Sequence, residues 1–200
     1  MTWAKPLPFE FQIDDVDSLW RNHLEWYQTP YQNHSLNTNH VLSIPCGNQH
    51  PGSFGYIRKN HIHEGIDLYA PPDTPVYAVE DGVVVSILDF TGEKVGSPWW
   101  HETQSVMIEG ASGVVNLGEI TPLSHLKIGQ YVEAGTLIGH LKTVLKKFKG
   151  RPQTMLHLEL YQAGQRESLE WKMGSQPLGL MDPTPHLRLL AKQKLNHLFF

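Results

Sequence analysis

The chain has 200 residues, a single cysteine, and 20 acidic against 16 basic residues, which gives a formal net charge of −4. Because it has no basic excess, no nucleic-acid partner is expected. One cysteine excludes an intrachain disulfide. No apolar run approaches the roughly 18 residues of a membrane-spanning helix, so no membrane span is expected.

Histidine is the unusual feature of the composition, with 12 residues. It is the commonest metal ligand and the usual acid–base group near neutral pH. The first residues, MTWAKPLPFEFQ, contain no apolar stretch of the kind that a secretory signal needs. The sequence therefore predicts a cytoplasmic location if Met1 is the natural start, and it leaves leaderless export or a truncated start open.

The first 40 residues are predicted to form a helical extension and linker. Residues 14–27 place four apolar side chains on one helical face: Val16, Leu19, Trp20 and Tyr27. Residues 28–40 are rich in Asn, Gln, His, Ser and Thr, as is typical of a loop.

Residues 41–163 are predicted to form an all-β domain. Short apolar runs alternate there with Gly, Pro and Asp, at 41–45, 65–70, 75–79, 82–88, 105–110, 113–120, 136–141 and 154–162. Turn signals at this spacing indicate an antiparallel sandwich or barrel. Residues 164–200 are expected to form a polar connection and a short helix over 185–198, with Leu187, Leu190 and Leu198 on one side.

Two clusters carry side chains suited to metal chemistry. His63 and Asp67 are four residues apart, so in an extended chain they face the same side and offer two ligands for zinc. In the second cluster, alternation places Met155, His157 and Glu159 on one face of a strand, opposite three leucines. Taken alone, each cluster could also consist of ordinary solvated polar residues. For the second cluster this would mean that His157 lies on the solvated face of an edge strand.

Together the two clusters resemble peptidase family M23, the zinc metallopeptidases of lysostaphin and LytM type. HEGID at 63–67 and PVYAVEDGVV at 75–84 match the family patterns His-x-Gly-x-Asp and Pro-Val-x-Ala-x-x-x-Gly-x-Val. KIGQYVEAGTLIG at 127–139 and LHLE at 156–159 match two later family segments. The resemblance covers roughly residues 44–190. It implies an antiparallel β-sandwich or barrel-like domain, the duplicated hybrid motif fold.

The resemblance also implies a cofactor and its ligands. The family's zinc ligands correspond to His63, Asp67 and His157. Zinc held by three protein groups keeps a position for water, lowers its pKa and polarises a peptide carbonyl. The implied function is endopeptidase hydrolysis of peptides, with peptidoglycan-type cross-links as the substrate class.

The chain departs from the family at both catalytic histidines, where it has Met155 and, by the best local alignment, Glu119. In one interpretation Glu119 is the general base, and His61, His101 or a backbone amide supplies the oxyanion donor. In the other, the domain binds zinc and a ligand without hydrolysis. A third interpretation, a β-sandwich without metal, also remains open.

Five further residues are predicted near the metal or in a substrate groove. Met155 and Glu159 share the face of His157. His61 and His101 are also candidates for this region. Trp100 of the SPWWHE segment could stack on a substrate. Core packing is the alternative for this tryptophan, because adjacent side chains in an extended segment point to opposite faces.

Overall fold

The computed structural model describes residues 2–13, 41–47, 50–147 and 152–196. The helix predicted over 14–27 lies outside these residues. The elements in chain order are β1 (Glu10–Ile13), β2 (Val41–Ile44), β3 (Ile66–Tyr69), β4 (Pro75–Tyr77), β5 (Gly82–Thr91), the 3₁₀ turn η1 (Glu93–Val95), β6 (Thr103–Gly110), β7 (Gly113–Pro122), β8 (Tyr131–Val132), β9 (Leu137–Leu141), β10 (Met155–Tyr161), β11 (Leu180–Met181) and the helix α2 (Thr184–Asn196).

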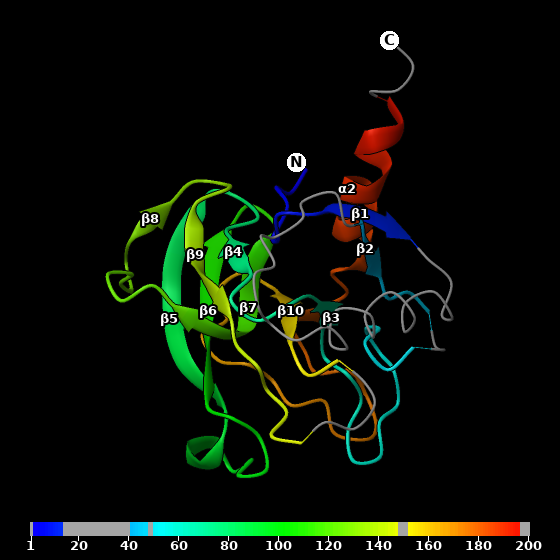
Figure 1. Cartoon of the computed structure of the whole chain (residues 1–200), viewed down its shortest axis with the longest axis vertical. Coiled ribbons are helices and arrows are strands. Elements are labelled where there is room, and N and C mark those ends of the chain that lie inside the picture. The colour runs from blue at the N-terminus through cyan, green and yellow to red at the C-terminus, as the bar shows by residue number, and fades with distance from the viewer. Residues whose placement is uncertain (1, 14–40, 48–49, 148–151, 197–200) are drawn as a thin grey trace, which may run out of the picture.

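Nine of the described strands form one branched sheet. Its main path runs β11-β10-β7-β6-β5-β8, while β3 pairs with β10 and β9 joins β4 to β7. All of these pairs are antiparallel. The path ends at β11 and β8, on opposite sides of the sheet, so it does not close into a barrel (Figure 1). The predicted all-β antiparallel fold is confirmed.

Strand β10 lies inside the sheet, with β3, β7 and β11 as neighbours. Leu156, Leu158 and Leu160 are buried on one face, in the main core cluster. The other face of β10 is buried as well, since every residue from Met155 to Tyr161 is shielded from solvent. The alternative of an edge strand with a solvated histidine is therefore wrong.

Strand β7 changes partner at a β-bulge. Val106 of β6 pairs with Leu117 and Gln104 with Ile120, so Ser105 faces both Gly118 and Glu119. Up to Gly118 the strand pairs with β10, and from Ile120 onwards it pairs with β9. Glu119 therefore lies between the part of β7 that pairs with β10 and the part that pairs with β9, and its φ is 66°. Bulges re-aim side chains and are frequent beside active sites.

The N-terminal segment contributes to the same core. Strand β1 pairs with β2 in parallel, an arrangement that the predicted helical extension did not include. The alternation in FEFQI explains the strand, because Phe9 and Phe11 are buried together with Trp3 and Leu7. The boundaries at residues 40 and 163 stay a prediction.

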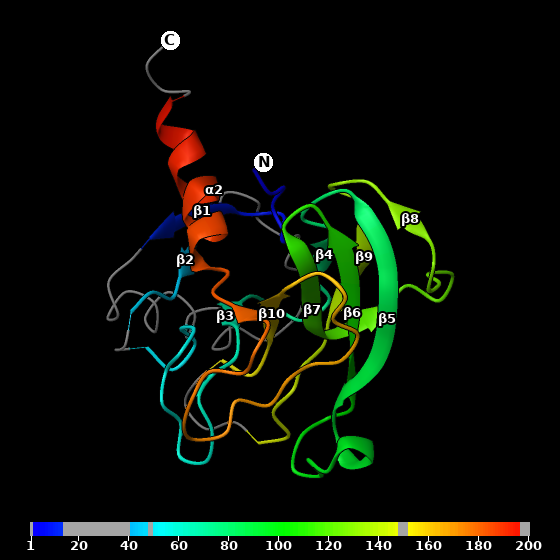
Figure 2. The same ribbon diagram turned by 180° about the vertical axis from the view of Figure 1, so that it is seen from behind.

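Helix α2 confirms the predicted C-terminal helix. It packs on β1 and β2, on the side of the molecule away from β5 and β8 (Figures 1 and 2). Leu187 and Leu190 of this helix are both buried, as expected for its apolar side, while Leu198 lies outside the described residues. Within the described part of the chain, no helix is long and apolar enough to cross a membrane.

Candidate metal centre

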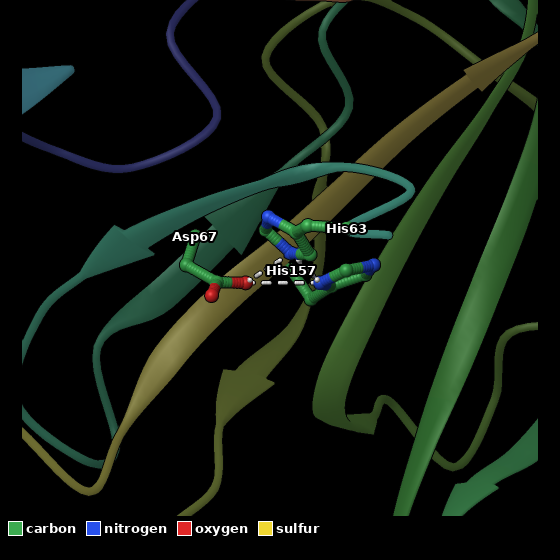
Figure 3. Close-up of side chains that lie close together, drawn as sticks. All are labelled: His63, Asp67 and His157. Atoms are coloured by element: carbon green, nitrogen blue, oxygen red, sulfur yellow. Dashed lines mark hydrogen bonds and ion pairs between the residues drawn. The ribbon is translucent and has the colours of Figure 1, made fainter. Parts of the chain in front are cut away.

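Three side chains from distant parts of the chain converge in the interior. Asp67 Oδ1 lies 3.1 Å from His63 Nε2 and 2.9 Å from His157 Nδ1. The two imidazole nitrogens are 3.2 Å apart. Figure 3 shows the three side chains pointing toward one another, and all three are buried. In the described residues this is the cluster that could hold a metal ion, and its members are the three residues predicted as ligands.

Strand register and one close turn create this convergence. Asp67 of β3 and His157 of β10 are directly opposed in the antiparallel ladder. His63 precedes β3, so it reaches the site from a turn and not through the alternation of a strand. The turn passes so close to β10 that a Cβ on Gly65 would lie 2.5 Å from the carbonyl oxygen of Leu158. Only glycine allows this approach.

Neighbouring groups fix the orientation of His63 and Asp67. His63 Nδ1–H donates to the carbonyl of Ser53 at 2.9 Å, which leaves the Nε2 lone pair facing the site. The Arg58 guanidinium donates to Asp67 Oδ2 at 2.6 Å and to the carbonyl of Pro51 at 2.7 Å. With one Asp67 oxygen held by Arg58, the other is directed at the two histidines.

His157 is oriented by the carboxylate of Glu159. Its Nε2 lies 3.1 Å from Glu159 Oε1, on the side of the ring away from Asp67. Donation of the Nε2 proton to that carboxylate leaves Nδ1 available for a metal. Each predicted ligand therefore has one atom facing the centre and another bound to a protein group.

Burial and the mutual contacts shift the pKa values of the cluster. Burial lowers the pKa of His63 to about 4, against the opposing charge of Asp67. Burial alone would raise the pKa of Asp67, but His63 and Arg58 hold it well below its usual range. Burial would lower the pKa of His157, yet its hydrogen bonds to Asp67 and Glu159 hold it well above 6.5.

Glu119 approaches this centre from the bulge in β7. Its neighbour Gly118 pairs directly with His157, and the residue is 8% exposed. Burial first, and then the charge of Asp67, raise the pKa of Glu119 to about 8. Its Oε2 is buried and has no hydrogen-bond partner among the described residues. The charges of Asp67 and His157 both act on this carboxyl group. Once ionised, a carboxyl oxygen without a partner suits a proton acceptor.

Three other predicted site residues contribute no ligand to this cluster. Met155 is buried in β10, two residues before His157. His61 is half-buried, and its carbonyl accepts the backbone N–H of Arg58. His101 is exposed and lines a cavity of about 540 Å³ together with His140 and Lys142.

The tryptophans of the SPWWHE segment differ in exposure. Trp99 is 62% exposed, whereas Trp100 is half-buried and its backbone forms an isolated antiparallel β-bridge with Leu145. Their rings pack edge to face at 6.2 Å. The predicted role of Trp100 in a substrate groove stays a prediction.

Sequence reasoning missed several residues that support the ligands: Ser53, Arg58, Asn116, Tyr161 and Ser168. None of them belongs to a recognisable ligand spacing, because each acts through a contact made by the fold. Alternation along β10 did single out Glu159 as a neighbour of His157.

Comparison with known protein families identifies the family of this chain. The model of peptidase family M23 matches residues 61–168, more than half of the chain. The chain therefore belongs to peptidase family M23, as the sequence resemblance predicted. None of the curated proteins that were compared matches the chain.

Three solved structures are similar to parts of this chain at low identity. The catalytic domain of the antimicrobial peptidase lysostaphin from Staphylococcus simulans is 19% identical, with a TM-score of 0.46 over 68% of this chain and 89% of that one. The catalytic domain of a point mutant of the prophage-encoded M23 protein EnpA from Enterococcus faecalis is 19% identical, with a TM-score of 0.43 over 76% and 93%. LytM of Ruminococcus gnavus is 24% identical, with a TM-score of 0.44, and the match covers 66% of this chain and 47% of LytM, about half its length.

Proposed function

We propose that this chain is a zinc metalloendopeptidase that hydrolyses peptide bonds, with peptidoglycan-type cross-links as its substrate class. Two imidazoles and one carboxylate are a donor set that zinc takes in catalytic sites. His63 Nε2, Asp67 Oδ1 and His157 Nδ1 would hold the ion, and their mutual separations lie within 4.8 Å. Zinc so bound lowers the pKa of a water and polarises a carbonyl.

The observation that carries the catalytic proposal is the carboxyl group of Glu119 in the bulge of β7. Oε2 of this residue would accept the proton of the attacking water and later return it to the leaving amine. A pKa of about 8 in the metal-free protein keeps Glu119 largely protonated at neutral pH. A divalent cation beside it favours the ionised form, which is the form that a general base needs.

A second function is favoured by Met155. This side chain is buried where the family has a histidine, and a thioether cannot donate or accept a proton in catalysis. If a second proton-transfer group is essential, the domain would bind zinc and a peptide ligand without hydrolysis. The two functions share the metal centre and differ only in turnover.

The test is to measure zinc content and hydrolysis of muropeptides and glycine-rich peptides by the parent protein, His63→Ala and Glu119→Gln. Hydrolysis by the parent that depends on zinc and is lost in both variants supports the endopeptidase. Zinc bound at one equivalent without hydrolysis of any peptide supports the binding module. Met155→His is the matched gain-of-function variant: hydrolysis that appears only with this substitution identifies the missing histidine as the reason for inactivity.

A further inference from the structure

Glu159 is a buried carboxylate whose two oxygens are fully engaged. The residue is 1% exposed and lies two positions after His157, on the same face of β10. An isolated carboxylate in such a place would be strongly unfavourable, so it requires hydrogen-bond donors. The surrounding structure supplies them from four different side chains.

The four donors divide evenly between the two oxygens. Oε1 accepts from His157 Nε2 at 3.1 Å and from Ser168 Oγ at 2.9 Å. Oε2 accepts from Asn116 Nδ2 at 2.6 Å and from the Tyr161 hydroxyl at 2.8 Å. An amide at position 159 could not replace this group, because its NH₂ would face two donors on one side.

The arrangement decides which nitrogen of His157 faces the metal centre. An imidazole can present either ring nitrogen to a metal, and the hydrogen bond of the other nitrogen fixes the choice. Here Nε2 is bound to Glu159 and Nδ1 faces Asp67 at 2.9 Å. The Phe90 ring, with its centroid 5.5 Å from that of His157, limits movement of the imidazole.

The C-terminal strap, residues 164–171, completes this arrangement from outside the sheet (in orange in Figures 1 and 2). It supplies the Ser168 hydroxyl, and the backbone N–H of Leu169 donates to the Tyr161 hydroxyl at 2.9 Å. At its end the strap is tied to the loop of His63: Trp171 N–H donates to Glu64 Oε1 at 2.7 Å. The strap is thereby bonded both to β10, which carries His157, and to the loop that carries His63.

We propose that Glu159 is a positioning residue that directs Nδ1 of His157 to the metal, and that Ser168 of the C-terminal strap holds Glu159 in place for this role. The proposal rests on the proposed function only in that the centre binds zinc. It assigns the strap, which follows the last ligand in the chain, a part in metal affinity.

The test measures zinc affinity by competition with a chelator, using the full chain. Loss of a group that orients a metal ligand weakens metal binding by about 10–100-fold, and we expect this for Glu159→Gln. Ser168→Ala should weaken binding less, because three donors to Glu159 remain. Glu80→Gln is the matched control: Glu80 is also buried, accepts hydrogen bonds from Ser112, and should leave zinc affinity unchanged.

A spectroscopic measurement separates positioning from a general structural effect. Long-range ¹H–¹⁵N spectra of the zinc-loaded parent should show His157 with a proton on Nε2 and the metal on Nδ1. Glu159→Gln should alter that pattern, and Glu159→Asp, which keeps the charge, should restore part of the affinity. If Glu159→Gln fails to fold, Ser168→Ala provides the test, because Ser168 is an exposed residue whose truncation leaves the core intact.

Zinc affinity within twofold of the parent in both Glu159→Gln and Ser168→Ala would overturn the proposal, as would a metal bound through Nε2 of His157. A folded Glu159→Gln with its affinity and its His157 spectrum both changed supports it. Lack of hydrolysis by the zinc-loaded parent would contradict the endopeptidase function alone. A parent that binds no zinc would overturn both.

Discussion

Replacement of Glu119 by glutamine tests the chemistry of the centre without a substrate. The pKa of Glu119 is raised from 4.5 to about 8 in the metal-free protein, mainly by burial and then by Asp67. Below 4.5 the carboxyl group is protonated in both the folded and the unfolded chain. Between 4.5 and about 8 the unfolded chain loses this proton while the folded protein retains it. The free energy of unfolding therefore falls as pH rises through this window.

The size of the effect follows from the two pKa values. One pKa unit corresponds to about 1.4 kcal/mol, so the separation sets an upper limit of about 5 kcal/mol. Relaxation around the charged form reduces this, and we expect about 2–4 kcal/mol. Glutamine has the same shape and no charge, so Glu119→Gln should remove this loss and make the metal-free protein more stable than the parent at about pH 8, with little difference at about pH 4.5.

The assay is urea unfolding of both proteins in the presence of a chelator, at several values of pH across the window. If the free energy of unfolding changes with pH in the same way for the parent and Glu119→Gln, the placement of this carboxyl group in a buried site beside Asp67 is refuted. Zinc is the internal control, because the cation should reduce the difference between the two proteins. In the zinc-loaded state the same substitution should retain the metal and lower hydrolysis by about 10²–10⁴-fold.

Three further predictions follow from the same centre. Because the pKa of His157 is held well above 6.5 in the metal-free protein, zinc must displace its proton. Calorimetry at about pH 6 in buffers of different ionisation enthalpy should therefore detect release of at least one proton, and zinc affinity should rise about tenfold or more per pH unit from about pH 5 to 6.5. Arg58→Ala removes the 2.6 Å ion pair with Asp67 and should weaken zinc binding by about 10–100-fold in chelator competition, whereas unchanged affinity would show that the pair does not orient this ligand. Leu158→Ala, at a fully buried position in β10, should cost about 2–5 kcal/mol in chemical denaturation, and a loss below about 1 kcal/mol would argue against this core.

Alternation along β10 was sufficient to place His157 and Glu159 on one face and three leucines on the other. The pattern is local, because successive side chains of a strand point to opposite faces whatever the partner strand is. The same reasoning predicted the all-β domain and the C-terminal helix. The same parity argument placed His63 and Asp67 on one side of an extended chain; in the structure the two side chains do converge, although His63 lies before the strand.

What the local pattern left open was the environment of each side chain. An edge strand and a central strand have the same alternation, and only the pairing of β10 with β3 and β7 buries His157. Strand pairing depends on residues far apart in the chain, so it cannot be read from one segment. The parallel pairing of β1 with β2 escaped prediction for the same reason.

The sequence by itself determined the fold class and the face that His157 and Glu159 share, because these follow from residue identity and from the period of a strand. The tertiary structure alone decided that Glu119 lies in a bulge of β7 next to the residue paired with His157, that Arg58 holds Asp67, and that Ser168 reaches Glu159 from the strap. These contacts arise from strand register and chain crossings over long sequence separations, and no local spacing of residue types encodes them.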